Sequence, residues 1–214
     1  MDIALYIAPN TCALAPFITL TEAKAAFEPR PLNFRQREHM TPDYLKLNPR
    51  HKVPTLIVDG QALTENVAIQ VWIARTFPEA KILPADLWQQ AKAISILSWC
   101  ASGFHPLLAR INNPAKACDV AGTEARVREI AEGELFENLA IADEMLAGRD
   151  FFFDHFTASD AHFFWCFRRA TQFGVATGRF ANAQAHFERM QKRASVQAFL
   201  AFEKKMAEGF AKVA

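Results

Sequence analysis

The pattern of apolar residues changes near residue 77, and this change most constrains the fold. Before it, short apolar runs alternate with amphipathic stretches, as in chains where strands alternate with helices. After it, apolar residues recur at helical spacing without a convincing strand. We therefore expect an α/β domain over residues 1–77, a linker with two prolines over 78–85, and an all-α helical bundle over 86–214.

The first part carries signals for a βαβ unit followed by a ββα unit. A helical crossover makes the first two strands parallel, and Asp59-Gly60 is a strong signal for a tight hairpin between the last two. Thr64 is expected to cap the helix that follows. The expected strands are 3–8, 27–34, 53–59 and 62–63, and the expected helices are 14–26, 42–47 and 65–76.

The second part is expected to be helical throughout. Thr157 and Asp160 form a capping-box pattern before an apolar run, so we expect a folding role for both, with a loss of about 1 kcal/mol when either is removed. The aromatic run Phe151–Phe156 is expected to fill the core at a turn. The expected helices are 86–110, 123–147 and 158–173, with shorter ones toward the C-terminus.

Composition excludes several classes of partner. The formal net charge is +1 and charges of both signs are mixed along the chain, which argues against a nucleic-acid partner. No apolar run approaches the roughly 20 residues that span a bilayer, so no membrane partner is expected. The four cysteines are widely spaced, which fits neither a disulfide framework nor a zinc site, and no metal is expected. Reduced thiols in a cytoplasmic protein are the expectation.

Cys12 is the strongest candidate for chemistry. It falls where an apolar strand turns into a helix, and Pro16 is typical of a position close to a helix start. The positive end of a helix dipole stabilises a thiolate, which is the reactive form of cysteine. The alternative is a small buried apolar side chain, and that is the expected role of Cys100, Cys118 and Cys166.

Two further segments suggest a binding site. If the Val53-Pro54 bond is cis, the Val53 backbone turns outward and can bind a peptide-like ligand; otherwise the proline simply begins a strand. Glu65-Asn66 lies at a helix start, where backbone N–H groups and a carboxylate suit a ligand with a carboxylate and an amine. The alternative is that Glu65 only complements the helix dipole.

Together these features resemble the glutathione S-transferases over nearly the whole chain. Tyr6-Ile-Ala-Pro-Asn-Thr-Cys12-Ala-Leu-Ala-Pro16 is similar to the bacterial beta-class pattern, in which cysteine replaces the tyrosine or serine of other classes. Leu47-Asn48-Pro49-Arg50 before Val53-Pro54 is similar to the family's Asn-Pro-x-x-x-Val-Pro segment. The resemblance implies a thioredoxin-like first domain, an all-α second domain and a homodimer.

The resemblance also implies roles for individual residues. Val53 and Pro54 match the pair whose valine backbone holds the cysteinyl part of glutathione, and Glu65 and Asn66 match the pair that binds its γ-glutamyl end, where many relatives have serine in place of Asn66. His105, in Trp99-Cys-Ala-Ser-Gly-Phe-His105-Pro, resembles a beta-class histidine near the active-site sulfur.

Two reactions remain open, and glutathione is the co-substrate in both. In conjugation, donors near Thr11 and Cys12 stabilise the glutathione thiolate, which attacks a small apolar electrophile bound by the helical domain. Side chains such as those around Phe104, Leu107 and Leu108 would line that pocket, although they could equally be core. In exchange with a disulfide substrate, Cys12 forms a mixed disulfide, and glutathione must resolve it because Ala15 stands where a second cysteine would be needed. His105 can serve either reaction. The non-enzymatic alternative is a protein that only binds glutathione or apolar ligands, or a dimeric scaffold.

Overall fold

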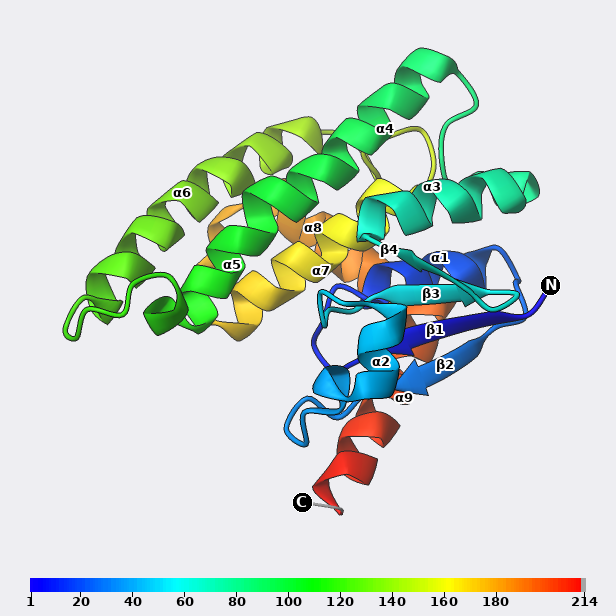
Figure 1. Cartoon of the computed structure of the whole chain (residues 1–214). Coiled ribbons are helices and arrows are strands. Elements are labelled where there is room, and N and C mark those ends of the chain that lie inside the picture. The colour runs from blue at the N-terminus through cyan, green and yellow to red at the C-terminus, as the bar shows by residue number, and fades with distance from the viewer. Residues whose placement is uncertain (213–214) are drawn as a thin grey trace. The chain divides into compact units, whose positions relative to one another are not determined.

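A computed structural model describes residues 1–212 of the chain (Figure 1). Its contacts divide the chain into two compact units. The first unit combines Met1–Ala85 with the C-terminal segment from Lys192 onward, and the second is Asp86–Gln191. The C-terminal segment therefore groups with the α/β unit, although we expected 86–214 to form one domain. The assignment of binding roles to 1–77 and 86–214, with a linker at 78–85, stays a prediction.

The first unit contains a four-stranded sheet in the order β2-β1-β3-β4. Its strands are β1 (Ile3–Ile7), β2 (Glu28–Pro31), β3 (Thr55–Val58) and β4 (Gln61–Thr64). β1 is parallel to β2 and antiparallel to β3, where Leu5 lies opposite Leu56, and both side chains are fully buried. The hairpin between β3 and β4 turns at Asp59 and Gly60, which both have positive φ. The predicted βαβ–ββα order of a thioredoxin-like domain is confirmed, with boundaries that differ by a few residues.

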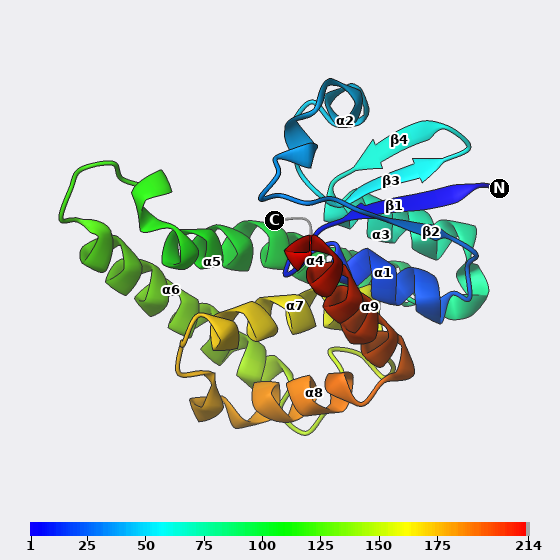
Figure 2. The ribbon, with the colours of Figure 1, turned by 90° about the horizontal axis from the view of Figure 1, so that it is seen from below.

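Four helices accompany this sheet. They are α1 (Leu14–Glu22), α2 (Pro42–Leu47), α3 (Asn66–Thr76) and α9 (Ala194–Ala211), with 3₁₀ turns at Glu38–Met40 and Pro78–Ala80. Figure 2 shows α1 and α3 together on one face of the sheet and α2 on the other. The predicted starts at Leu14 and Pro42 are confirmed.

Two predicted helix ends in this unit are wrong. α1 stops at Glu22 rather than at 26, because Lys24 adopts a left-handed conformation and the Ala25 N–H bonds back to the Leu20 carbonyl. Thr64 does not cap α3, since Glu65 occupies the N-cap position and the Thr64 hydroxyl accepts a hydrogen bond from Arg50.

The C-terminal helix α9 packs against α1. The ring of Phe17 lies 5.3 Å from the ring of Phe199 and 5.4 Å from that of Phe202, measured between centroids. Figure 2 shows the two helices side by side. This aromatic contact explains why α9 belongs to the first unit, although the helices of Asp86–Gln191, which precede it in the sequence, form the second.

The second unit is helical, as predicted. Its helices are α4 (Leu87–Trp99), α5 (His105–Asn112), α6 (Glu124–Met145), α7 (Ala158–Gln172) and α8 (Ala181–Gln191), with 3₁₀ turns at Pro114–Lys116 and Thr177–Arg179. α7 is the most buried of them and contacts α4, α5 and α8. Phe152 and Phe156 are buried in the turn before α7, which confirms their predicted core-filling role.

The single helix predicted over 86–110 is interrupted. A π-helical turn at Cys100–Phe104 separates α4 from α5. Pro106 supplies the reason, because it has no N–H to donate and its ring displaces the carbonyl four residues earlier. Gly103 fits this turn closely, since a β-carbon there would lie 2.6 Å from Cδ1 of Trp99.

The capping box before α7 is present. The Asp160 carboxylate accepts hydrogen bonds from the backbone N–H and the hydroxyl of Thr157 at 2.7 and 2.9 Å. It also accepts from the Phe152 N–H and from Nε2 of His186, both at 3.0 Å. The box is therefore larger than its two-residue sequence pattern indicates.

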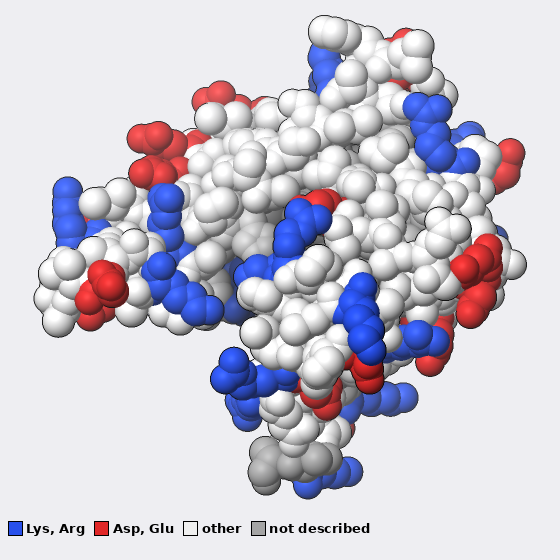
Figure 3. Space-filling view, viewed as in Figure 1, with Lys and Arg blue, Asp and Glu red and all other residues white. Residues whose placement is uncertain are grey.

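Charged side chains of both signs are interspersed on the face in Figure 3. Over residues 1–212, no helix combines the length and the apolar character that crossing a membrane requires.

Candidate active site

Cys12 lies in the turn that joins β1 to α1. The Thr11 hydroxyl donates to the Ala8 carbonyl at 2.7 Å, and the helix begins at Leu14, so the sulfur lies just ahead of the first helical residue. Cys12 is 6% exposed, and its Sγ lies 3.8 Å from the carbonyl oxygen of Val53, which accepts a weak hydrogen bond from the thiol. The structure thus brings three predicted site residues, Thr11, Cys12 and Val53, into one locality.

Burial governs the protonation of this thiol. Desolvation raises the pKa of Cys12 to about 11, more than hydrogen bonds from Asn66 and from its own backbone N–H lower it, and the nearby charge of Glu65 raises it further. Burial therefore outweighs the stabilisation of a thiolate that we expected from the helix start. At neutral pH Cys12 is a thiol, which can donate a hydrogen bond but is a poor nucleophile.

The Val53-Pro54 peptide bond is cis, which confirms the first of the two possibilities raised by the sequence. Polar side chains hold the segment beside it. Nδ2 of Asn48 donates to the Lys52 carbonyl at 2.9 Å and to the Thr55 hydroxyl at 3.1 Å. The buried Tyr44 hydroxyl bonds to both of these groups as well. The sequence analysis assigned no role to Tyr44, although a tyrosine just before the Asn-Pro segment is a signal for such a contact.

Glu65 and Asn66 lie at the start of α3, as predicted, but their side chains differ in exposure. Glu65 has a φ of 72° and an exposed carboxylate, which pairs with Nη1 of Arg50 at 2.9 Å. Nη2 of Arg50 donates to the Thr64 hydroxyl at 2.8 Å. Sequence reasoning assigned no role to Arg50, which places a cation beside the carboxylate expected to meet an amine.

Asn66 serves the protein itself. Its side chain is buried and donates to the Cys12 carbonyl at 2.8 Å, while its Oδ1 accepts from Gln70 at 3.4 Å. Gln70 in turn accepts from the Thr19 hydroxyl at 2.7 Å. The Asn66 side chain thus links α3 to the Cys12 turn, and the role of Asn66 at the γ-glutamyl end of glutathione stays a prediction. Its backbone N–H, at the first position of α3, remains the group expected to meet a ligand.

His105 belongs to the second unit, where it is the first residue of α5 after the π-helical turn. Its ring lies 4.6 Å from that of Trp165 on α7. His162, also on α7, is fully buried, and desolvation together with the nearby charge of His105 lowers its pKa to about 3. His105 thus sits among aromatic rings and a neutral histidine, and its role beside Cys12 stays a prediction.

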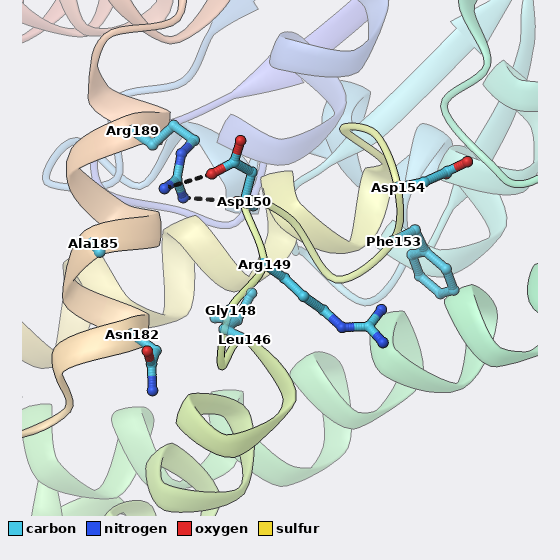
Figure 4. Close-up of a pocket in the computed structure, with 9 residues that line it drawn as sticks. All are labelled: Leu146, Gly148, Arg149, Asp150, Phe153, Asp154, Asn182, Ala185 and Arg189. Atoms are coloured by element: carbon cyan, nitrogen blue, oxygen red, sulfur yellow. Dashed lines mark hydrogen bonds and ion pairs between the residues drawn. The ribbon is translucent and has the colours of Figure 1, made fainter.

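The predicted wall for an electrophile is core within this unit, because Phe104, Leu107 and Leu108 are all buried. A hollow of about 600 Å³ lies instead between the end of α6, the loop after it and α8 (Figure 4). Arg189 spans one side of it, bonded to the carboxylate and the carbonyl of Asp150 at 2.8 Å each. Across residues 1–212, no three His, Cys, Asp or Glu side chains cluster as a metal site requires.

The chain is similar to known proteins over nearly its whole length. The family model described as "Glutathione S-transferase, N-terminal domain" matches residues 1–75. The chain is 33% identical over 203 residues to glutathione S-transferase GST-4.5 of Xanthomonas campestris, covering 93% of this chain and 98% of that one. It is similar to a sphingomonad glutathione S-transferase complexed with glutathione, with a TM-score of 0.83, 30% identity and coverage of 94% and 98%. The beta-class enzyme of Sphingomonas chungbukensis gives a TM-score of 0.82, 30% identity and the same coverage.

Proposed function

Since this chain belongs to the glutathione S-transferase family and resembles its bacterial beta class, we propose that it joins the glutathione thiol to small electrophiles with Cys12 acting as a hydrogen-bond donor. Glutathione is the co-substrate of the family. One observation carries the proposed role of Cys12: its thiol has a pKa of about 11 and lies beside the Val53 carbonyl. A thiol that stays protonated at neutral pH can donate to the sulfur of glutathione.

In this reaction the glutathione sulfur is the nucleophile. Its proton leaves to solvent or to a base, for which His105 is the candidate. The thiolate forms a bond from sulfur to carbon while the electrophile releases its leaving group. Cys12 Sγ–H and the backbone N–H groups ahead of Leu14 lower the energy of the anionic sulfur before attack.

The remaining parts of glutathione are assigned to other residues of the first unit. The Val53 backbone holds the cysteinyl part, Thr11 flanks the sulfur, and Glu65 with the Asn66 N–H binds the γ-glutamyl end. The match of these positions to the family's motif supports the assignment. Pro54 fixes the direction of the Val53 backbone, and the buried Asn48 and Tyr44 hydroxyl contacts hold that segment in place.

Thiol exchange is the second candidate reaction. Cys12 is the sole cysteine in residues 1–85 and 192–214, so a mixed disulfide in this unit must form on it. Its thiolate attacks one sulfur of a disulfide and expels the other as a thiolate, and a glutathione thiolate then releases Cys12. Because the pKa of Cys12 is about 11, this reaction should accelerate about tenfold per pH unit through neutral pH.

A homodimer and a cytoplasmic location complete the proposal. The family resemblance supports the dimer, and light scattering of the purified protein tests it. None of the four cysteines forms a disulfide within residues 1–212, which fits a reducing compartment.

The test compares wild type, Cys12→Ser and Cys12→Ala. Conjugation is measured with a chlorodinitrobenzene, and the glutathione adduct is measured by intact mass spectrometry after incubation with oxidised glutathione. We expect Cys12→Ser to keep conjugation within a fewfold of wild type, because its hydroxyl also donates, and Cys12→Ala to lose about tenfold. A reducible adduct, located by peptide mass spectrometry, should form slowly on Cys12 of wild type and be absent at residue 12 of both variants.

Two results would overturn parts of this assignment. If Cys12→Ala keeps both activities, Cys12 has no chemical role. If wild type is retained on immobilised glutathione but converts no electrophile or disulfide in a broad panel, the non-catalytic binding alternative replaces the enzyme.

A further inference from the structure

The hollow drawn in Figure 4 lies entirely within the second unit. Its walls come from the end of α6, the loop that joins α6 to α7, and α8, and the proposed function assigns no role to the residues that line it. Its volume of about 600 Å³ falls within the roughly 300–1,000 Å³ of typical small-molecule sites. The hollow is therefore large enough for one small ligand, and the side chains around it determine which kind.

One ring of the aromatic run before α7 faces this hollow. Phe151 packs edge-on against Phe156, and Phe152 packs edge-on against Phe163. Phe153 is only half-buried, lines the hollow, and contacts no other aromatic ring within residues 1–212 (Figure 4). The expectation that the run fills the core is therefore wrong for Phe153. The exposed part of its ring is available to an aromatic group of a ligand.

Arg149 places an unpaired positive charge near that ring. Its exposed guanidinium lines the hollow, and within residues 1–212 it forms no ion pair or hydrogen bond. Arg149 and Phe153 both also line a neighbouring hollow, which α4 and the end of α6 bound. They therefore lie together on the wall between the two hollows, and Figure 4 shows Arg149 extending to the side on which Phe153 lies. A guanidinium has N–H donors in a planar fork that matches a carboxylate.

The other charged side chains of the hollow are already engaged. Arg189 bonds to the carboxylate and the carbonyl of Asp150 at 2.8 Å each. Asp154 is hydrogen-bonded to Nδ1 of His155, and its side chain is 90% exposed, so water and salt screen its charge. Arg149 thus carries the charge that is free to meet a ligand, and it favours an anion.

From these contacts we infer that the hollow is a second ligand site, which binds a small aromatic carboxylate. The carboxylate accepts two parallel hydrogen bonds from Arg149, and the aromatic ring packs on Phe153. Leu146 and Ala185 add apolar surface to the same hollow. An inorganic anion would make no use of Phe153, and a neutral aromatic molecule would make no use of Arg149. All of these residues lie in the second unit, so the inference is independent of the proposed role of Cys12.

The experiment measures the binding of benzoate to the full chain by saturation-transfer NMR at low salt. Two further probes separate the parts of the recognition: benzamide keeps the ring without the charge, and cyclohexanecarboxylate keeps the charge without an aromatic ring. Wild type is compared with Arg149→Gln and Phe153→Leu. Arg126→Gln is the matched control, because Arg126 is an exposed arginine at the other end of α6, where it pairs with Glu129.

A second set of titrations separates this hollow from the glutathione site. Each titration is repeated with saturating S-hexylglutathione, which occupies a glutathione site and places an alkyl chain at its sulfur. We expect the dissociation constant of benzoate to stay unchanged, because the two ligands bind different residues.

We expect saturable binding of benzoate to wild type. Arg149→Gln should weaken it about tenfold, because a charge-assisted bidentate contact is lost. Phe153→Leu should weaken it about threefold, because the contact between two aromatic rings is lost. Benzamide should bind wild type about tenfold more weakly than benzoate, and cyclohexanecarboxylate about threefold more weakly. Arg126→Gln should match wild type.

The inference is overturned if wild type shows no saturable binding up to about 10 mM benzoate, or if Arg149→Gln binds benzoate as tightly as wild type does. It is also overturned if benzamide binds as tightly as benzoate, or if S-hexylglutathione displaces benzoate, because the ligand would then occupy the glutathione site. Arg149 is exposed, so its replacement should leave the fold intact, and the melting temperature of each variant checks this.

Discussion

Each unit places an ionisable side chain at the start of a helix, and the two are surrounded in opposite ways. In the second unit, Asp160 has no exposed surface, and its carboxylate accepts four hydrogen bonds from Phe152, Thr157 and His186. In the first unit, Cys12 is almost as buried, but its sulfur faces a carbonyl oxygen at 3.8 Å and its pKa rises to about 11.

The difference separates a folding role from a chemical one. All the donors around Asp160 are committed to the protein, so its charge is compensated and it has little to offer a ligand. The buried Cys12 thiol has less compensation, and its S–H makes a weak hydrogen bond to the Val53 carbonyl that a stronger acceptor on a ligand can replace. Two side chains at helix starts thus differ in how far hydrogen bonds compensate their burial, and the following predictions test this difference.

Removing the Asp160 carboxylate should have the largest effect. Asp160→Ala leaves two backbone N–H groups, a hydroxyl and a buried histidine without their acceptor, so the free energy of unfolding should fall by about 3–5 kcal/mol. Urea denaturation measures it. This exceeds the 1 kcal/mol that the two-residue pattern suggested, and a loss below that value would contradict the four-bond description.

Alkaline pH should destabilise the protein through Cys12. Burial raises the pKa of the Cys12 thiol from its ordinary value of 9.0 to about 11, so the protonated thiol contributes stability below pH 9 that is lost as pH rises toward 11. Between pH 8 and 11 wild type should lose about 2 kcal/mol more than Cys12→Ser. Urea denaturation of wild type and Cys12→Ser at each pH measures this difference. If the free energies of unfolding of the two proteins fall in parallel as pH rises, the effect of burying the thiol is ruled out.

Loss of the Thr157 hydroxyl should have a smaller effect. Thr157→Ala removes one of the four hydrogen bonds but keeps the backbone N–H that Asp160 also accepts, so we expect a cost of about 1 kcal/mol. Thr157→Ser restores the hydroxyl and serves as the control. The melting temperatures of both variants measure the difference, and an equal loss in Thr157→Ser would assign the effect to the methyl group.

The exposed ion pair of Arg50 with Glu65 should have the smallest effect on stability. Both side chains are more than half exposed, so Arg50→Gln should change the free energy of unfolding by less than about 0.5 kcal/mol. Chemical denaturation at low and high salt measures it. A fall of more than 1 kcal/mol in the free energy of unfolding would mean that this ion pair stabilises the fold, as Asp160 does.

Local signals predicted most of the fold. The starts of α1 and α2, the hairpin at Asp59-Gly60 and the capping box depend on residues close together in the sequence. The end of α1 was missed because Lys24 adopts the left-handed conformation that a glycine would have signalled. The place of α9 was missed because aromatic contacts with Phe17, far away in the sequence, decide it.

The site was predictable to a similar degree. The position of Cys12 follows from a short motif, whereas the cis bond at Val53-Pro54 was one of two possibilities that the sequence left open. The protonation of Cys12 does not follow from a motif, because it depends on how much protein surrounds the sulfur. The same holds for Asn66, whose side chain turns inward to the Cys12 carbonyl, and for Glu203 on α9, which accepts a hydrogen bond from the Asn10 N–H although no motif connects the two.

Because α9 belongs to the first unit, it also determines the order in which the two units can be completed during synthesis. The second unit is one continuous stretch, Asp86–Gln191, and can close as soon as that stretch has left the ribosome. The first unit is completed only by α9, which follows that stretch, so the Cys12 turn emerges before the second unit and is secured after it. In a nascent chain, the hydrogen bond from the Asn10 N–H to Glu203 near the Cys12 thiol cannot form until translation has passed Glu203.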